Sequence, residues 1–148
     1  MAHRVKIASP QEIVPLDYAA LRSAARAVLE GEGIAEASLS LAFVDNATIH
    51  RLNKQFLDHD EPTDVLTFPL SGPGAKTLEG ELVIGVEVAQ VAAADRGHAV
   101  GIELVLYVVH GVLHLCGYDD TSPAATKAMR ARERHYLTQL GLPDIAES

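Results

Sequence analysis

The sequence predicts an α+β domain, in which helices cover a single mixed sheet and one buried helix carries metal ligands. Between a short first strand and the last helix, the inferred elements run helix, strand, helix, strand, strand, helix, helix, so some neighbouring strands are separated by helices and others are not. Residues 100–115 are apolar nearly all the way round, as in a central buried helix, yet they include two histidines. A chain of 148 residues fits one domain, so we expect residues 1–148 to form a single unit.

The first part of the chain indicates a strand and then a helix. Residues 3–7 predict a short strand. Pro15 suits the first turn of a helix, and Gly31 and Gly33 suit its end. The apolar stripe expected on this helix consists of Tyr18, Leu21, Ala25, Val28 and Leu29.

The next segment changes from a period of two to a helical period. Residues 38–43 alternate between polar and apolar side chains, which predicts a half-buried strand with its apolar residues inward. Those residues are Leu39, Leu41 and Phe43. Asp45 or Asn46 can cap the helix that follows. The apolar stripe expected on that helix consists of Ile49, Leu52 and Phe56.

The second half predicts two strands and three helices. Strands are expected at 64–69 and 81–86, and a helix over 87–96 that ends at Gly97. The buried helix follows at 100–115. Ser122 and Pro123 are a capping residue and a proline at the first helical position, so the last helix is expected to start there.

The buried helix ends in a pattern typical of a metal site. His110 and His114 are four residues apart, and because each helical residue advances about 100°, both rings lie on one face. Gly117 can adopt the left-handed conformation that ends a helix and turns the chain back. The turn would bring Asp120 to the same point, with Asp119 as the alternative oxygen ligand. Three such ligands on a tetrahedral zinc leave the fourth position for water.

The polar residues of this helix have other interpretations. A single histidine on an apolar face is more often a core residue bonded to its surroundings than a ligand, but the pair followed by an acidic turn favours metal binding. Buried imidazoles also cost free energy unless their polar atoms are satisfied, and a metal satisfies them. Cys116 lies about 240° round the helix from His110, so we expect a small buried hydrophobic residue rather than a ligand.

Three segments resemble the signatures of a known family. Residues 110–120 (HGVLHLCGYDD) resemble the signature of the YbeY family of metal-dependent endoribonucleases, in which the last position is usually a third histidine. Residues 62–69 (PTDVLTFP) and 80–84 (GELVI) resemble the other two signatures, in the same order and spacing. The chain departs from the family at Asp120, and at Leu57, where an arginine usually follows the Leu-Asn-x-x-Phe pattern.

The resemblance implies a fold with four principal strands and a zincin-like buried helix. It also implies a single-strand-type endoribonuclease that acts in ribosomal RNA processing, namely 16S rRNA 3′-end maturation, with the small ribosomal subunit and its associated factors as partners. The catalytic residues and ligands would be His110, His114 and Asp120, with one Zn²⁺ per chain. An aspartate ligand reduces the net charge of the site, so Mn²⁺ or another divalent ion is also expected to bind.

Candidate substrate contacts lie among the basic residues and in the second signature. Thr63 and Asp64 lie in the second signature, although Asp64 is equally suited to satisfying backbone donors in a turn. Arg51 and Lys54, three apart on one predicted helix, are candidate phosphate contacts in place of the missing arginine. A second basic stripe on the last helix is more commonly a solvated surface, and it consists of Lys127, Arg130 and Arg134.

Charge and composition limit the partners. A net charge of −8 ordinarily argues against nucleic acid, but RNA binding needs only a local basic surface, and a metal adds positive charge there. Residues 1–6 lack the apolar run of a signal peptide, and a single cysteine excludes an internal disulfide. We therefore expect a cytoplasmic protein with no membrane partner, and the resemblance implies RNA rather than DNA as its partner.

Two other function classes remain open at this point. Zinc metallopeptidases share the spacing of the three ligands but place a glutamate directly after the first histidine as general base, where this chain has Gly111. A non-catalytic ribosome-associated factor with a structural metal is the other class, and the lack of an arginine at Leu57 favours it.

Overall fold

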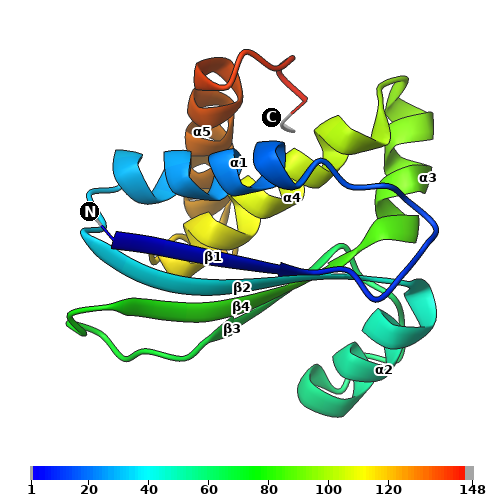
Figure 1. Cartoon of the computed structure of the whole chain (residues 1–148), viewed down its shortest axis with the longest axis horizontal. Helices are drawn as coiled ribbons and strands as arrows, with labels where there is room; N and C mark the ends of the chain where they lie inside the picture. Colours follow the sequence, from blue (N-terminus) through cyan, green and yellow to red (C-terminus); the bar gives the residue numbers. More distant parts are fainter. Residues whose placement is uncertain (1, 146–148) are drawn as a thin grey trace.

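A computed structural model describes residues 2–145, and within them four strands form one mixed sheet surrounded by five helices (Figure 1). The elements in chain order are β1 (Ala2–Ala8), α1 (Tyr18–Gly31), β2 (Glu36–Val44), α2 (Asn46–Leu57), β3 (Val65–Pro69), β4 (Leu78–Gly85), α3 (Val86–Arg96), α4 (Val100–Leu115) and α5 (Pro123–Gln139). The sheet order is β1-β2-β4-β3, in which β3 alone runs antiparallel to its neighbour. The predicted fold class, α+β with a four-stranded mixed sheet, is confirmed.

The two faces of the sheet carry unequal cores. Helices α1, α4 and α5 lie on one face, and α2 lies on the other (Figure 1). The predicted alternation in β2 is confirmed, because Leu39, Leu41 and Phe43 are all buried on the face with the three helices. The smaller core under α2 consists of Val44, Ile49, Leu66 and Val83.

Helix α4 lies against β4 through two reciprocal glycine contacts. A Cβ atom at Gly111 of α4 would be 2.7 Å from Leu82 Cδ1 of β4. In the other direction, a Cβ atom at Gly80 of β4 would be 2.6 Å from Leu115 Cδ2 of α4. A leucine of each element therefore packs against a glycine of the other. This close packing holds the helix that carries the histidines near the sheet.

The start of α1 differs from the sequence expectation. The helix begins at Tyr18, and the Oδ1 atom of Asp17 accepts a hydrogen bond from the backbone N–H of Ala20. This carboxylate satisfies a donor that the helix itself leaves unpaired, so the helix starts after Asp17 and not at Pro15. Tyr18 is consequently 43% exposed, and its assignment to the buried stripe was wrong.

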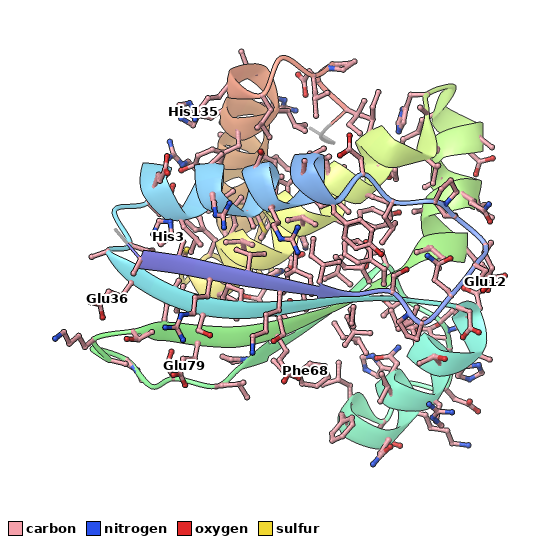
Figure 2. The ribbon with its side chains drawn as sticks, viewed as in Figure 1. His3, Glu12, Glu36, Phe68, Glu79 and His135 are labelled. Carbon is pink, nitrogen blue, oxygen red and sulfur yellow. The ribbon has the colours of Figure 1, made fainter. Side chains whose placement is uncertain are left out.

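The end of α2 also differs. Phe56 was expected on the buried stripe, but its side chain is 57% exposed. Among the residues of α2 only Ile49 and Asn53 are buried, and the end of the helix diverges from the sheet (Figure 1). The Phe56 ring contacts Phe68 edge-on, with centroids 5.5 Å apart, and Phe68 points to the side of the sheet where α2 lies (Figure 2).

The remaining elements agree with the sequence to within a few residues. Helix α4 has the predicted bounds, and Ser122 caps α5 with Pro123 in the first turn, as predicted. Strand β4 begins at Leu78, three residues before the expected start. Within residues 2–145 no single helix is long and apolar enough to cross a membrane, although α3 and α4 reach that length and hydropathy together, with a bend of 117° between them.

Candidate metal centre

The last two turns of α4 present both histidines at the edge of the buried layer. The side chains of His110 and His114 are 17% and 25% exposed, whereas the residues around them on α4 are mostly buried. The two rings meet edge to face with centroids 4.7 Å apart, and their Nε2 atoms are 3.2 Å apart. The i, i+4 spacing therefore brings both rings to one point, as predicted.

The turn after α4 brings a carboxylate to the same point. Gly117 has φ +107°, and the backbone N–H groups of Gly117 and Tyr118 donate to the carbonyls of His114 and Leu113. These two bonds form a Schellman motif, in which the left-handed glycine reverses the chain. The oxygens of Asp120 lie 4.0 Å from Nε2 of each histidine, so the predicted return of an acidic side chain is confirmed.

A carboxylate that directly follows α1 anchors this turn. Glu32 accepts hydrogen bonds from the hydroxyl of Tyr118 at 2.9 Å, from the hydroxyl of Tyr136 at 2.5 Å, and from the guanidinium of Arg132. Burial alone would raise the pKa of Glu32, but the bonds from Tyr136, Arg132 and Tyr118 outweigh it and the pKa lies below its ordinary value. The turn that holds Asp120 is thus tied to the end of α1 and to α5 through an ionised group.

The donor set fits a divalent metal ion. Among residues 2–145, His110, His114 and Asp120 form a group whose ligand atoms all lie within 4.8 Å of one another. In a tetrahedral zinc site with bonds of about 2.0–2.1 Å, ligand atoms are about 3.3–3.4 Å apart, so small side-chain movements suffice. The pKa of His114 lies below its ordinary value, because burial, and then the neighbouring His110, disfavour the imidazolium. A neutral imidazole is the form that binds metals.

The two rival ligands lie outside this group. The Oδ1 atom of Asp119 accepts hydrogen bonds from the backbone N–H and the hydroxyl of Thr121, so this carboxylate is engaged in the turn. Cys116 lines a different pocket, together with Leu115 and Gly117, and burial raises the pKa of its thiol to about 11. Its position agrees with the prediction of a non-ligating residue, although the side chain is half-buried rather than fully buried.

Sequence reasoning missed an outer contact of the site. The Nδ1 atom of His110 lies 2.6 Å from Oε2 of Glu133 on α5, and the side chain of Glu133 is fully buried. Arg130 donates from Nη1 to both oxygens of Glu133, at 2.8 and 2.9 Å. A signal existed, because Glu133 lies on the same helical stripe as Met129, Tyr136 and Leu137, which are all buried.

A narrow cleft of about 210 Å³ opens beside the histidines. The residues that line it are Asp64, Arg96, Leu106, Tyr107, His110, Asp120 and Arg130. Burial, and then the charges of Glu103 and Asp64, raise the pKa of Tyr107, so its hydroxyl stays protonated. The cleft therefore combines two guanidinium groups, a phenol and two carboxylates around one face of His110.

Asp64 has the turn role that the sequence suggested, and its side chain also lies at the cleft. Its Oδ1 atom accepts from the backbone N–H of Val65 at 2.7 Å and from the hydroxyl of Thr63 at 3.3 Å, as a turn residue does. It also lines the cleft beside His110. The turn contacts therefore fix a carboxylate at the cleft rather than exclude it from the site.

The basic stripe of α5 lies closer to the site than the sequence suggested. A groove of about 680 Å³ is lined by Asp120, Thr121, Ser122, Pro123, Thr126, Lys127, Arg130 and Arg134. Asp120 and Arg130 line both this groove and the cleft. Arg134 also pairs with Asp144 at 3.1 Å. The last helix thus contributes an arginine to the site itself.

The basic residues of α2 are placed differently. Arg51 and Lys54 are not among the residues that line the cleft or the groove, and α2 lies on the opposite face of the sheet from α4 (Figure 1). Hydrogen bonds from Thr48 lower the pKa of Asp45, and the charge of Arg51 adds to this effect. Lys54 Nζ lies 4.0 Å from Asp60 Oδ2. Leu57, where the family signature has an arginine, is 51% exposed on the same helix.

This fold and site define a class of protein, an α+β domain whose buried helix presents a histidine pair and an acidic turn to a narrow cleft. The family model described as "Endoribonuclease YbeY" matches residues 6–141. The Endoribonuclease YbeY of Pelotomaculum thermopropionicum is 43% identical over 129 residues, covering 82% of this chain and 85% of that protein. That of Chloroflexus aggregans is 37% identical over an alignment that covers 97% of this chain and 99% of that protein.

A solved structure agrees with these matches. The solution structure of TM1509 from Thermotoga maritima superposes with a TM-score of 0.65 at 26% identity, over 92% of this chain and 88% of that one. The chain therefore belongs to the YbeY endoribonuclease family.

Proposed function

We propose that this protein is a metal-dependent endoribonuclease that processes ribosomal RNA in the cytoplasm. The observation that carries the proposal is the convergence of His110, His114 and Asp120 in a chain of the YbeY endoribonuclease family. The substrate proposed from the family resemblance is the 3′ end of 16S rRNA, in association with the small ribosomal subunit.

The proposed ligands hold one divalent ion per chain, zinc or manganese. Such an ion supplies Lewis acidity toward a phosphoryl oxygen and lowers the pKa of a bound water to about 7. His110 and His114 offer neutral nitrogen donors, and Asp120 offers a carboxylate that reduces the charge of the site. Two histidines and one carboxylate are an established catalytic zinc set, so the replacement of the usual third histidine is compatible with hydrolysis.

We further propose that the scissile phosphate is held in the cleft beside His110. Arg96 from α3 and Arg130 from α5 line this cleft, and guanidinium groups bind phosphate through paired N–H donors. These two arginines provide positive charge beside the proposed metal site, whereas Leu57 stands where the family usually has an arginine. Thr63 and Asp64 remain proposed substrate contacts, and of the two Asp64 lines this cleft.

The general base of a zinc peptidase has no place at the corresponding position. In those enzymes a glutamate directly follows the first histidine. Here a side chain at Gly111 would meet Leu82 of the buried sheet and not the cleft. The chain therefore lacks, at this position, the general base that those enzymes use for peptide hydrolysis.

The central test compares His114→Ala with His135→Ala. His135 is an exposed histidine on α5 that lies away from the cleft, so it controls for the loss of a histidine (Figure 2). We expect His114→Ala to lose both bound metal and cleavage of ribosomal RNA, and His135→Ala to keep both. Metal content is measured by mass spectrometry, and cleavage with end-labelled RNA in the presence and absence of chelator. Unchanged metal content in His114→Ala, or chelator-resistant cleavage, would refute the proposal, as would robust hydrolysis of a peptide panel abolished by His110→Ala.

RNA contacts outside the cleft are tested by salt dependence. Each lost phosphate contact should reduce the slope of log affinity against log salt by about 0.7–1. We expect Lys127→Ala with Arg134→Ala to flatten the slope, because these residues line the groove that adjoins Asp120. Arg51→Ala with Lys54→Ala tests the sequence-based proposal, with an expected change of about 1–2 units at constant metal content. If either double variant has the same salt slope as the wild type, its two residues do not contact RNA phosphates.

A further inference from the structure

Glu133 is one of three buried polar residues among those that the structure describes, with Asn53 and Glu103. A carboxylate taken out of water loses several kcal/mol of hydration, which only well-placed partners offset. The partners of Glu133 are Arg130, which donates to both carboxylate oxygens, and Nδ1 of His110 at 2.6 Å. One of its two side-chain partners is therefore a proposed metal ligand.

These contacts determine which nitrogen of His110 faces the metal site. A carboxylate that accepts a guanidinium on both oxygens is an acceptor and not a donor, so Nδ1 of His110 must carry the hydrogen. The neutral ring then has its lone pair on Nε2. That atom lies 3.2 Å from Nε2 of His114 and 4.0 Å from Asp120.

We propose that Glu133 is a positioning residue for the metal site, an inference that rests on the proposed function. Glu133 holds the His110 ring in one orientation and one tautomer, so that Nε2 is presented to the ion as a free lone pair. A carboxylate behind a ligating histidine also makes the imidazole a stronger donor. Arg130 binds Glu133 and also lines the cleft. Through this pair of residues, α5 both supports the proposed ligand His110 and forms part of the proposed substrate site.

His114 has a weaker counterpart of this support. The backbone group that acts on its ring is that of Tyr118, within the turn that follows α4. That contact comes from the same local segment as the ligands themselves. Within residues 2–145, Glu133 is the carboxylate that reaches a proposed ligand from another helix.

The chain contains a matched control in Glu103. This carboxylate is also fully buried, and it also binds one histidine, His98 at 2.5 Å, and one arginine, Arg96 at 3.3 Å. His98 does not belong to the metal-ligand group. If the role of Glu133 were purely structural, replacing it should affect Zn²⁺ binding no more than replacing Glu103 does.

The experiment compares Glu133→Gln with Glu103→Gln in the metal-free protein. Affinity for Zn²⁺ is measured by competition with a chromophoric chelator, and unfolding is followed with chelator present. We expect Glu133→Gln to weaken the Zn²⁺ affinity by about 10- to 100-fold, the usual effect of removing such an outer partner. Both variants should lose stability, but Glu103→Gln should bind Zn²⁺ as the wild type does.

A second measurement does not depend on a variant that folds. In the wild-type protein, long-range ¹⁵N–¹H correlations of the imidazoles should show the hydrogen of His110 on Nδ1. Wild-type Zn²⁺ affinity in Glu133→Gln, equal weakening in Glu103→Gln, or a hydrogen on Nε2 of wild-type His110 would each overturn the inference. If His114→Ala keeps its metal, the proposed site itself fails; if it loses the metal while Glu133→Gln does not, only the role of Glu133 fails.

Discussion

Replacing Gly111 by alanine tests how closely α4 lies against the sheet. The new methyl group would be 2.7 and 2.8 Å from the two Cδ atoms of Leu82, where carbon atoms normally pack at about 3.5–4.0 Å. Leu82 is fully buried, so neither group can move into solvent. Overpacking of this kind costs about 1–3 kcal/mol, and the better helix propensity of alanine returns about 1 kcal/mol. We expect a net loss of about 0–2 kcal/mol in the free energy of unfolding.

A double-mutant cycle isolates this contact from the propensity change. Leu82→Ala alone should cost about 2–5 kcal/mol, because it leaves a cavity. In the double variant the methyl group introduced by Gly111→Ala enters that cavity, so the total should be smaller than the sum by about 1–2 kcal/mol. Gly101→Ala is the matched control in the same helix, since its Cβ would meet no atom within 4 Å. It should stabilise the protein by about 0.5–1 kcal/mol.

The assay is equilibrium unfolding in urea, with chelator present so that metal binding does not contribute to the measured free energy. Additive losses for Gly111→Ala and Leu82→Ala, within about 0.5 kcal/mol, would refute the reasoning. A destabilised Gly101→Ala would show that the propensity correction is wrong for this helix.

Three further predictions concern the turn, the thiol and the anchoring carboxylate. Asp120→Ala should weaken Zn²⁺ binding by more than about 100-fold and Asp119→Ala by much less, as measured by chelator competition, and the reverse order would make Asp119 the ligand. Cys116, with a pKa of about 11, should be only about one part in a thousand thiolate at pH 8, so iodoacetamide should label the folded protein far more slowly than the protein in urea. Glu32 has a lowered pKa in the folded state, so its stabilisation is present above the pKa of the unfolded chain and is lost as pH falls through the folded value. Glu32→Gln should therefore cost more stability at pH 7 than at about pH 3, and an equal cost at both would contradict the assigned pairing.

The parts of the site that sequence could predict are local. The spacing of His110 and His114, the glycine turn and Asp120 all lie within one segment, where helical geometry alone relates the side chains. The bounds of α4 followed from its apolar composition for the same reason. Local periodicity was sufficient because each of these relations is set by the residues of the segment itself.

The parts that sequence could not predict depend on how helices pack. The approach of Glu133 to His110 spans 23 positions and depends on where α5 lies against α4. Likewise, the helical period of α2 suggested that Phe56 was buried, but the end of this helix diverges from the sheet and leaves the side chain exposed (Figure 1). Arg130 was assigned to a solvated stripe because no local pattern shows that a buried carboxylate lies beside it. Tertiary arrangement decided each of these cases.

The three proposed ligands lie between residues 110 and 120, and this has a consequence for how metal binding is linked to folding. Closing so short a segment around an ion costs little chain entropy, so an unfolded chain still offers all three donors. An ion that also binds the unfolded state stabilises the native state by less than its native affinity implies. Glu133 is supplied by a different helix and its bond to His110 exists only in the native packing. Part of the selectivity of the ion for the folded protein should therefore come from α5, although α5 supplies no ligand.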